Sequence, residues 1–227
     1  MTSGEALEPV GVTGPAERVA REQLVETGRR LVELGLSPGT SGNISVRVGT
    51  TMFITPTNVS MGELDPDHLA VLSIDGEHLD GPRPSKEFTL HGAFYRRTPD
   101  AGAVVHLHSV NAVAVACLEP WSDASAVGPI TPYFVMRVGQ TPLISYAPPG
   151  DKAQADELEA LDLPFRAALL ANHGSVVAQA DLTSAMNAAI ELEEACKLTL
   201  LTNGQSPRLL SPTQASELAS KYGSYWG

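Results

Sequence analysis

The alternation of apolar and polar positions divides the chain into helices and short strands. Apolar residues recur every three to four positions after Pro15, which predicts a helix that stops at Gly35. The same spacing predicts helices over residues 85–97, 111–118, 153–161 and 182–202, and a last one that starts at Ser211. Short β-branched or alternating runs predict strands over residues 44–48, 51–54, 69–74, 77–79, 103–108, 166–171 and 175–178. Residues 119–149 are rich in Pro and Gly, and no regular element is predicted there.

This order of elements predicts the fold class and the domain organisation. Helices that flank a sheet rich in short hairpins predict a three-layer α/β/α fold. Residues 1–14 have the Gly, Glu, Pro and Thr content of a flexible tail. No repeat, low-complexity tract or linker divides the remainder, so residues 15–227 are expected to form a single domain.

Composition and charge narrow the classes of partner. The formal net charge is −11 and no Lys/Arg cluster offsets it, which argues against a nucleic-acid partner but not against a small anionic substrate. No apolar stretch reaches the roughly 20 residues of a membrane span. The N-terminus lacks the basic-then-apolar pattern of a signal peptide, so we expect a cytoplasmic protein. Cys117 and Cys196 lie in apolar helical stretches and are expected to be buried free thiols.

A strand that ends in His-Leu-His is the most informative stretch of the chain. His106 and His108 point to the same face of this strand, about 7 Å apart along it, while Leu107 points into the core. His173 lies in a second turn between strands, and Glu87 offers a carboxylate. Three His and one carboxylate are a typical ligand set for a catalytic divalent metal. The alternative is that these histidines are ordinary core or surface residues.

Loops with anion-binding character lie elsewhere in the chain. Gly42 and Asn43 belong to a Gly-rich loop whose N–H groups can form an anion-binding nest, although such loops are often purely structural. Ser85 and Lys86 precede Glu87 at a predicted helix start, where an anion is favoured, and a carboxylate there can also be plain helix stabilisation. His91, one turn further, is interpreted as a packing residue or as a support for a ligand. His68 and His78 lie in polar hairpin sequence and are expected to be exposed.

Taken together, these residues resemble the class II aldolase and adducin family. The resemblance covers nearly the whole chain, and its pieces occur in the family's order: residues 39–47, Ile54-Thr55-Pro56-Thr57, Ser85-Lys86-Glu87, residues 103–108, Leu170-Ala171-Asn172-His173-Gly174 and residues 191–194. The resemblance implies a central, mostly antiparallel sheet. It also implies a homotetramer with active sites between subunits, which would explain the aromatic C-terminal tail.

The resemblance also implies a role for each site residue. His106, His108 and His173 would hold the metal, usually zinc, with Mn²⁺ or Co²⁺ as alternatives. Glu87 would be the acid/base and would ligate the metal when substrate is absent, and Tyr133 would be a second catalytic residue. The substrate phosphate would be bound by six residues: Gly42, Asn43, Thr57, Asn58, Ser85 and Lys86.

The family contains several reactions, so membership alone leaves the function open. Sugar-phosphate aldolases, such as those acting on fuculose 1-phosphate, have Ser-Ser-Glu where this chain has Ser85-Lys86-Glu87. The Lys form, together with residues 130–139, resembles the branch that decarboxylates 3-oxo-tetronate 4-phosphates, which are β-keto sugar-acid phosphates. We therefore expect release of carbon dioxide through a metal-stabilised enediolate to give dihydroxyacetone phosphate. The alternatives are an aldolase or epimerase acting on another phosphosugar, and a non-catalytic, adducin-like binding protein.

Overall fold

The computed structural model describes residues 14–227, so the predicted tail lies outside the described residues except for Gly14. The α-helices are α1 (Pro15–Glu33), α2 (Phe88–Arg97), α3 (Val110–Ala116), α4 (Pro132–Arg137), α5 (Lys152–Ala160), α6 (Leu182–Leu201) and α7 (Pro212–Tyr222). The strands are β1 (Asn43–Val48), β2 (Thr51–Ile54), β3 (Ala70–Ser73), β4 (His78–Asp80), β5 (Ala103–Leu107), β6 (Leu143–Ile144), β7 (Ala167–Leu170) and β8 (Gly174–Gln179). Two short 3₁₀ turns, η1 (Met61–Glu63) and η2 (Pro66–His68), connect β2 to β3.

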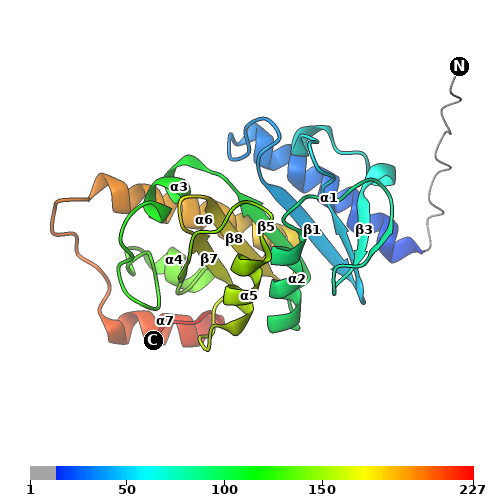
Figure 1. The fold of residues 1–227 in the computed structure, drawn as a ribbon. Coiled ribbons are helices and arrows are strands. Elements are labelled where there is room, and N and C mark those ends of the chain that lie inside the picture. The colour runs from blue at the N-terminus through cyan, green and yellow to red at the C-terminus, as the bar shows by residue number, and fades with distance from the viewer. Residues whose placement is uncertain (1–13) are drawn as a thin grey trace, which may run out of the picture.

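One sheet of eight strands forms the centre of the molecule (Figure 1). The strand order is β4-β3-β2-β1-β5-β8-β7-β6. Every neighbouring pair is antiparallel except β6 and β7, so the expected mostly antiparallel sheet is confirmed. β5 lies at the middle of this order, between β1 and β8.

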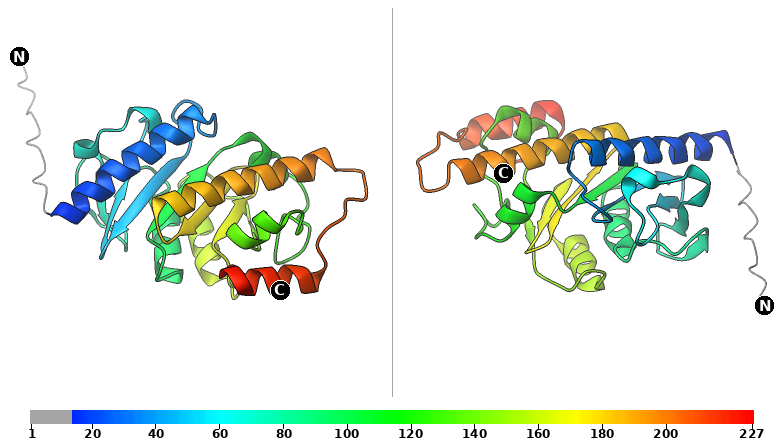
Figure 2. Two further views of the ribbon diagram at one scale, coloured as in Figure 1. Left: turned by 180° about the vertical axis from the view of Figure 1, so that it is seen from behind. Right: turned by 90° about the horizontal axis from the view of Figure 1, so that it is seen from above.

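Helices cover both faces of the sheet, which confirms the α/β/α architecture. α1 and α6 lie along one face, and α2 and α5 lie together on the other (Figure 2). Alternate residues of β5 pack against the helices on opposite faces of the sheet, because strand side chains alternate between faces. Val105 and Leu107 join the apolar core on the α1 and α6 side, whereas Val104 joins the core on the α2 and α5 side. His106 shares the face of Val104 and therefore points toward α2.

Three local expectations are corrected by the structure. The helix expected from Ser85 begins at Phe88, because the Ser85 N–H donates to the carbonyl of Thr55 (3.0 Å) and holds this segment extended. Residues 119–149 contain α4 and β6, which the Pro and Gly content obscured. Cys196 is buried as expected, but Cys117 is exposed because it follows the end of α3. Among the described residues, no helix has the length and apolarity that a membrane span requires.

Candidate metal and substrate site

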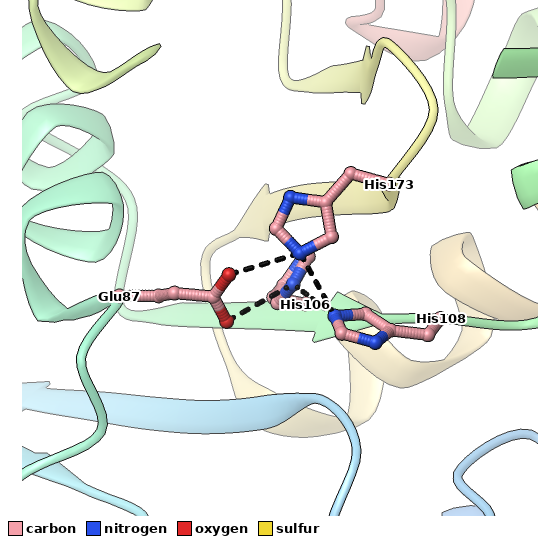
Figure 3. A group of neighbouring side chains, drawn as sticks. All are labelled: Glu87, His106, His108 and His173. Atoms are coloured by element: carbon pink, nitrogen blue, oxygen red, sulfur yellow. Dashed lines mark hydrogen bonds and ion pairs between the residues drawn. The ribbon is translucent and has the colours of Figure 1, made fainter. Parts of the chain in front are cut away.

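Three histidines meet at the end of β5 (Figure 3). His106 is the fourth residue of β5, His108 follows its last residue, and His173 lies in the turn between β7 and β8. The Nε2 atom of His108 lies 2.9 Å from Nε2 of His106 and 3.0 Å from Nε2 of His173. The prediction that His106 and His108 share one face, with His173 beside them, is therefore confirmed by the geometry.

Two glycines let the backbone approach close enough to form this cluster. A Cβ atom on Gly174 would lie 2.3 Å from the carbonyl oxygen of Leu107, so a side chain there would push β8 away from β5. Gly42 has φ +73°, and a Cβ on it would lie 2.7 Å from the carbonyl oxygen of His106. Glycine is thus required at both positions for close packing against the histidine strand.

The donor set fits a divalent cation. His106 donates its Nδ1–H to the carbonyl oxygen of Ser175 (2.8 Å), so in the neutral imidazole the lone pair lies on Nε2. One ligand atom from each His and one carboxylate oxygen of Glu87 lie within 4.8 Å of one another. In a tetrahedral site with metal–nitrogen bonds of about 2.0–2.1 Å, ligand nitrogens lie about 3.3 Å apart, close to the separations found here. Lone pairs that converge in this way are stabilised by a cation between them.

Glu87 lies beside the histidines as a carboxylate. Its Oε1 is 3.0 Å from Nε2 of His173, its Oε2 is 3.2 Å from Nε2 of His106, and its side chain is 11% exposed. Burial alone would raise the pKa of Glu87, but His106 and His173 outweigh burial and hold this pKa below its ordinary value. Glu87 in turn outweighs the effect of burial on His106 and raises the pKa of that imidazole. Burial and the two neighbouring imidazoles lower the pKa of His108 to about 4.

A small cleft opens next to Glu87 and His108. Its volume is about 170 Å³. All six predicted phosphate-binding residues line it: Gly42, Asn43, Thr57, Asn58, Ser85 and Lys86. A larger cavity of about 640 Å³ lies against α7 and Trp226, but none of the four clustered His and Glu residues lines it. The small cleft is therefore the candidate substrate site.

The cleft residues differ in what they can offer an anion. Lys86 is exposed and is the one cationic side chain among the residues that line the cleft. The Ser85 hydroxyl oxygen accepts a hydrogen bond from the Glu87 N–H (3.4 Å), which leaves its own hydrogen free to donate. Asn43 lines the cleft and also makes a contact that the sequence did not predict, because its buried side-chain amide donates to Oε2 of Glu87 (2.7 Å). The Asn43 side chain thus contacts Glu87, for which the family resemblance implies the acid/base role.

Tyr133 lies outside this cleft. It is the second residue of α4, its side chain is 57% exposed, and its ring lies against the guanidinium of Arg137. It is not among the residues that line the cleft in its own chain. A catalytic role for Tyr133 would therefore require a site on another copy of the chain.

The structure also reveals supporting roles that the sequence did not indicate. Ser175 acts through its main-chain carbonyl, which leaves no side-chain signal. Glu193 of α6 accepts hydrogen bonds from the Asn111 and Ala112 N–H groups at the start of α3, directly after His108. A polar residue on a buried helix face is the signal that could have identified Glu193.

The fold and the site together place a cleft that can take a small anion beside a cluster that could hold a divalent metal ion. The chain belongs to the class II aldolase and adducin family, since the family model "Class II Aldolase and Adducin N-terminal domain" matches residues 22–200.

The relatives of the chain include two kinds of lyase. The 3-oxo-tetronate 4-phosphate decarboxylase of Haemophilus influenzae is 41% identical over 88% of this chain and 96% of its own length. The L-fuculose phosphate aldolase of Escherichia coli K12 is 33% identical over 79% of this chain and 82% of its own length. Among solved structures, YgbL of Klebsiella pneumoniae is 38% identical and superposes with a TM-score of 0.85 over 90% of this chain and 100% of its own. YgbL is described as an aldolase, epimerase or decarboxylase, and this description does not choose among the three reactions.

Proposed function

We propose that this enzyme is a carboxy-lyase that converts a 3-oxo-tetronate 4-phosphate into dihydroxyacetone phosphate and carbon dioxide. The observation that carries the proposal is the 41% identity to a decarboxylase of that name over nearly the full length of both chains. The lysine of Ser85-Lys86-Glu87, which the sugar-phosphate aldolases replace by serine, supports the same choice.

The reaction requires a site that stabilises negative charge and supplies one proton. The ketone at carbon 3 is β to the carboxylate, so breaking the bond between carbons 1 and 2 releases carbon dioxide and leaves an enediolate across carbons 2 and 3. A divalent ion supplies Lewis-acid stabilisation of that charge. Protonation of carbon 2 completes the product, and each turnover consumes one proton from solvent.

The residues of the cleft match these requirements. Glu87 is the one carboxyl group among the residues that line the cleft, and we assign to it the transfer of the proton to carbon 2. Glu87 starts as a carboxylate, so it first takes up the proton from solvent and then passes it to carbon 2. Lys86, the Ser85 hydroxyl and the loops at Gly42, Thr57 and Asn58 would hold the phosphate.

We infer that zinc is the resident metal. Imidazole nitrogens with one carboxylate suit Zn²⁺, and Mn²⁺ or Co²⁺ can use the same ligands. His106, His108 and His173 would hold the ion, and Glu87 would join them when substrate is absent. A phosphorylated substrate does not cross membranes freely, which supports a cytoplasmic location.

We also infer a homotetramer with active sites between subunits. The position of Tyr133, exposed on α4 and outside its own cleft, supports this arrangement. The aromatic C-terminal tail gives less support, because Trp226 packs on Phe134 and Trp121 of its own chain.

The test is a direct assay with two readouts. Purified protein loaded with Zn²⁺ is given 3-oxo-tetronate 4-phosphate of either configuration at carbon 2, and carbon dioxide and dihydroxyacetone phosphate are measured together. We expect both products in equal amounts, and loss of both in a His106→Ala variant whose zinc content has fallen. Cleavage of fuculose 1-phosphate with no carbon dioxide from either tetronate would instead establish the aldolase. No turnover of any substrate and no bound metal would establish the adducin-like alternative.

A further inference from the structure

A line of buried polar side chains runs from the interior of the protein to Glu87. The Tyr95 hydroxyl lies 2.8 Å from Oγ of Ser45, which lies 2.7 Å from Nδ1 of His91. Nε2 of His91 lies 2.6 Å from Oδ1 of Asn43, whose Nδ2 donates to Glu87 (2.7 Å). Ser45, His91, Tyr95 and Asn43 are each at most 2% exposed. Buried polar groups of this kind are costly unless all of them are paired, and here each one is.

Two elements build this line from simple spacings. His91 and Tyr95 are four residues apart on α2 and therefore share one helix face. Asn43 and Ser45 are two residues apart on β1 and share one sheet face. The line therefore forms because α2 packs across β1, and it ends at Glu87, the residue that precedes α2.

The chemistry of each group fixes the direction of every hydrogen. The Glu87 carboxylate only accepts, so Asn43 must turn its NH₂ toward Glu87 and its oxygen toward His91. His91 must then carry its proton on Nε2, and burial keeps this imidazole neutral by lowering its pKa to about 3. The bare Nδ1 accepts from the Ser45 hydroxyl, and Ser45 accepts from Tyr95. Each donor thus points toward the carboxylate.

We propose that His91 is a positioning residue of the reaction, which acts through Asn43 to hold Glu87. An amide side chain has nearly the same shape after a half-turn, so packing alone does not distinguish its oxygen from its nitrogen. The Nε2–H of His91 makes this distinction together with the Glu87 carboxylate, because a turned Asn43 would set N–H against N–H at one end and oxygen against the carboxylate at the other. The NH₂ therefore remains on Oε2, the oxygen that also lies 3.2 Å from His106. The inference rests on the proposed role of Glu87.

The kinetic test compares two substitutions of His91. His91→Gln can place an amide N–H near the position of Nε2, so we expect turnover within a few-fold of wild type. His91→Leu removes the donor, and we expect kcat to fall roughly 10–100-fold, as for other residues that orient a ligand. KM and zinc content should change little. Tyr95→Phe, which removes only the far hydroxyl, should have the smallest effect. Equal losses in the Gln and Leu variants, or wild-type kcat in the Leu variant, would overturn the proposal.

Two further measurements separate positioning from mere packing. In an Asn43→Ala background, His91→Leu should cause little additional loss of kcat, because the two residues act as one unit; additive losses would contradict this. Nitrogen-15 NMR of the histidine side chains, with the His91 signal assigned in the wild-type protein through its own backbone resonances, should show a neutral Nε2–H imidazole from pH 6 to 9. A proton on Nδ1 would overturn the inference even if the variants fail to fold. The NMR result needs no substrate, so it stands apart from a failure of the wild-type enzyme to release carbon dioxide.

Discussion

At the scale of single residues, the site combines one carboxylate with one cation near three imidazoles. Glu87 contacts two histidines and Asn43, whereas Lys86, directly before it, is exposed at the mouth of the cleft. These two adjacent residues therefore lie in different surroundings. We propose a role in the chemical step for Glu87 and a role in binding for Lys86, and substitution can separate the two roles.

Replacing Glu87 by glutamine should abolish most turnover. The amide keeps the shape of the side chain but cannot transfer a proton, so we expect kcat to fall by about 10²–10⁴-fold while KM changes far less. Steady-state release of carbon dioxide measures this, with the exposed Glu63→Gln as the matched control. Near-normal turnover in Glu87→Gln would show that another group supplies the proton.

Replacing Lys86 by serine should weaken binding more than catalysis. If Lys86 bound the substrate carboxylate tightly, it would oppose decarboxylation, because negative charge leaves the carboxylate in the transition state. We therefore expect Lys86 to bind chiefly the phosphate, so that Lys86→Ser raises KM strongly and lowers kcat less. Lys152→Ser, on an exposed lysine of α5, is the control. An unchanged KM with abolished kcat would place Lys86 in the chemical step.

At the scale of secondary-structure elements, the ligands depend on how neighbouring elements are capped. Glu193 of α6 is 6% exposed and accepts hydrogen bonds from Ser109 Oγ (2.7 Å), the Asn111 and Ala112 main chain, and the Asn111 side chain. These groups form the start of α3, which follows His108 directly. A buried carboxylate on α6 thus holds the segment that follows His108, a proposed metal ligand.

Replacing Glu193 by glutamine should destabilise the protein. One of the two acceptor oxygens becomes a donor facing other donors, so we expect the free energy of unfolding to fall by about 1–3 kcal/mol. Urea unfolding followed by circular dichroism measures this. Glu194→Gln, on the exposed neighbour, should change stability by less than about 0.5 kcal/mol. Equal stability of the two variants would refute the capping role.

The polar line along α2 and β1 should give stability a pH dependence. Unfolded His91 takes up a proton below its ordinary pKa of 6.5, but the folded imidazole, with a pKa of about 3, does not. Wild type should therefore lose stability relative to His91→Gln as pH falls below 6.5, by up to about 1.4 kcal/mol per pH unit. Unfolding of the metal-free proteins at pH 7.5, 6 and 5 measures this difference. A difference that does not vary with pH would mean that His91 has the same pKa in the folded and the unfolded chain.

At the scale of the whole molecule, the question is how Tyr133 reaches a site. α4, which carries it, is held by the C-terminal residues of the same chain, since the Ser224 hydroxyl donates to Val135 (2.5 Å) and Gln140 N–H donates to Tyr225 (2.8 Å). Tyr133 is thus exposed on a well-anchored helix. Such a residue can serve the cleft of a neighbouring subunit.

Mixing two inactive variants should restore activity if the sites lie between subunits. His106→Ala lacks a metal ligand but keeps Tyr133, and Tyr133→Phe is the reverse. After joint unfolding and refolding at equal amounts, roughly a quarter of the sites would combine both intact residues. Carbon dioxide release by the refolded mixture measures this, with each variant refolded alone as the control. Activity no higher than that of the separate variants would place Tyr133 outside the site.

The sequence by itself determined the elements and most of the residues around the cleft. Periodicity located α1 and α6 because each buries one regular face, and a short apolar run located β5, which is buried on both faces. Strand alternation placed His106 and His108 on the same side. The order of the motifs along the chain was enough to indicate the family, since each motif needs only its local residues.

Only the tertiary structure decided how these pieces support one another. The start of α2 moved to Phe88 because the main chain of Ser85 pairs with Thr55, a contact between segments 30 residues apart in the sequence. Asn43 turned out to hold Glu87, because its amide is oriented by His91 from a different element. These hydrogen-bond partners depend on how a helix packs across a sheet, and the local spacing of residues along the chain does not predict that packing.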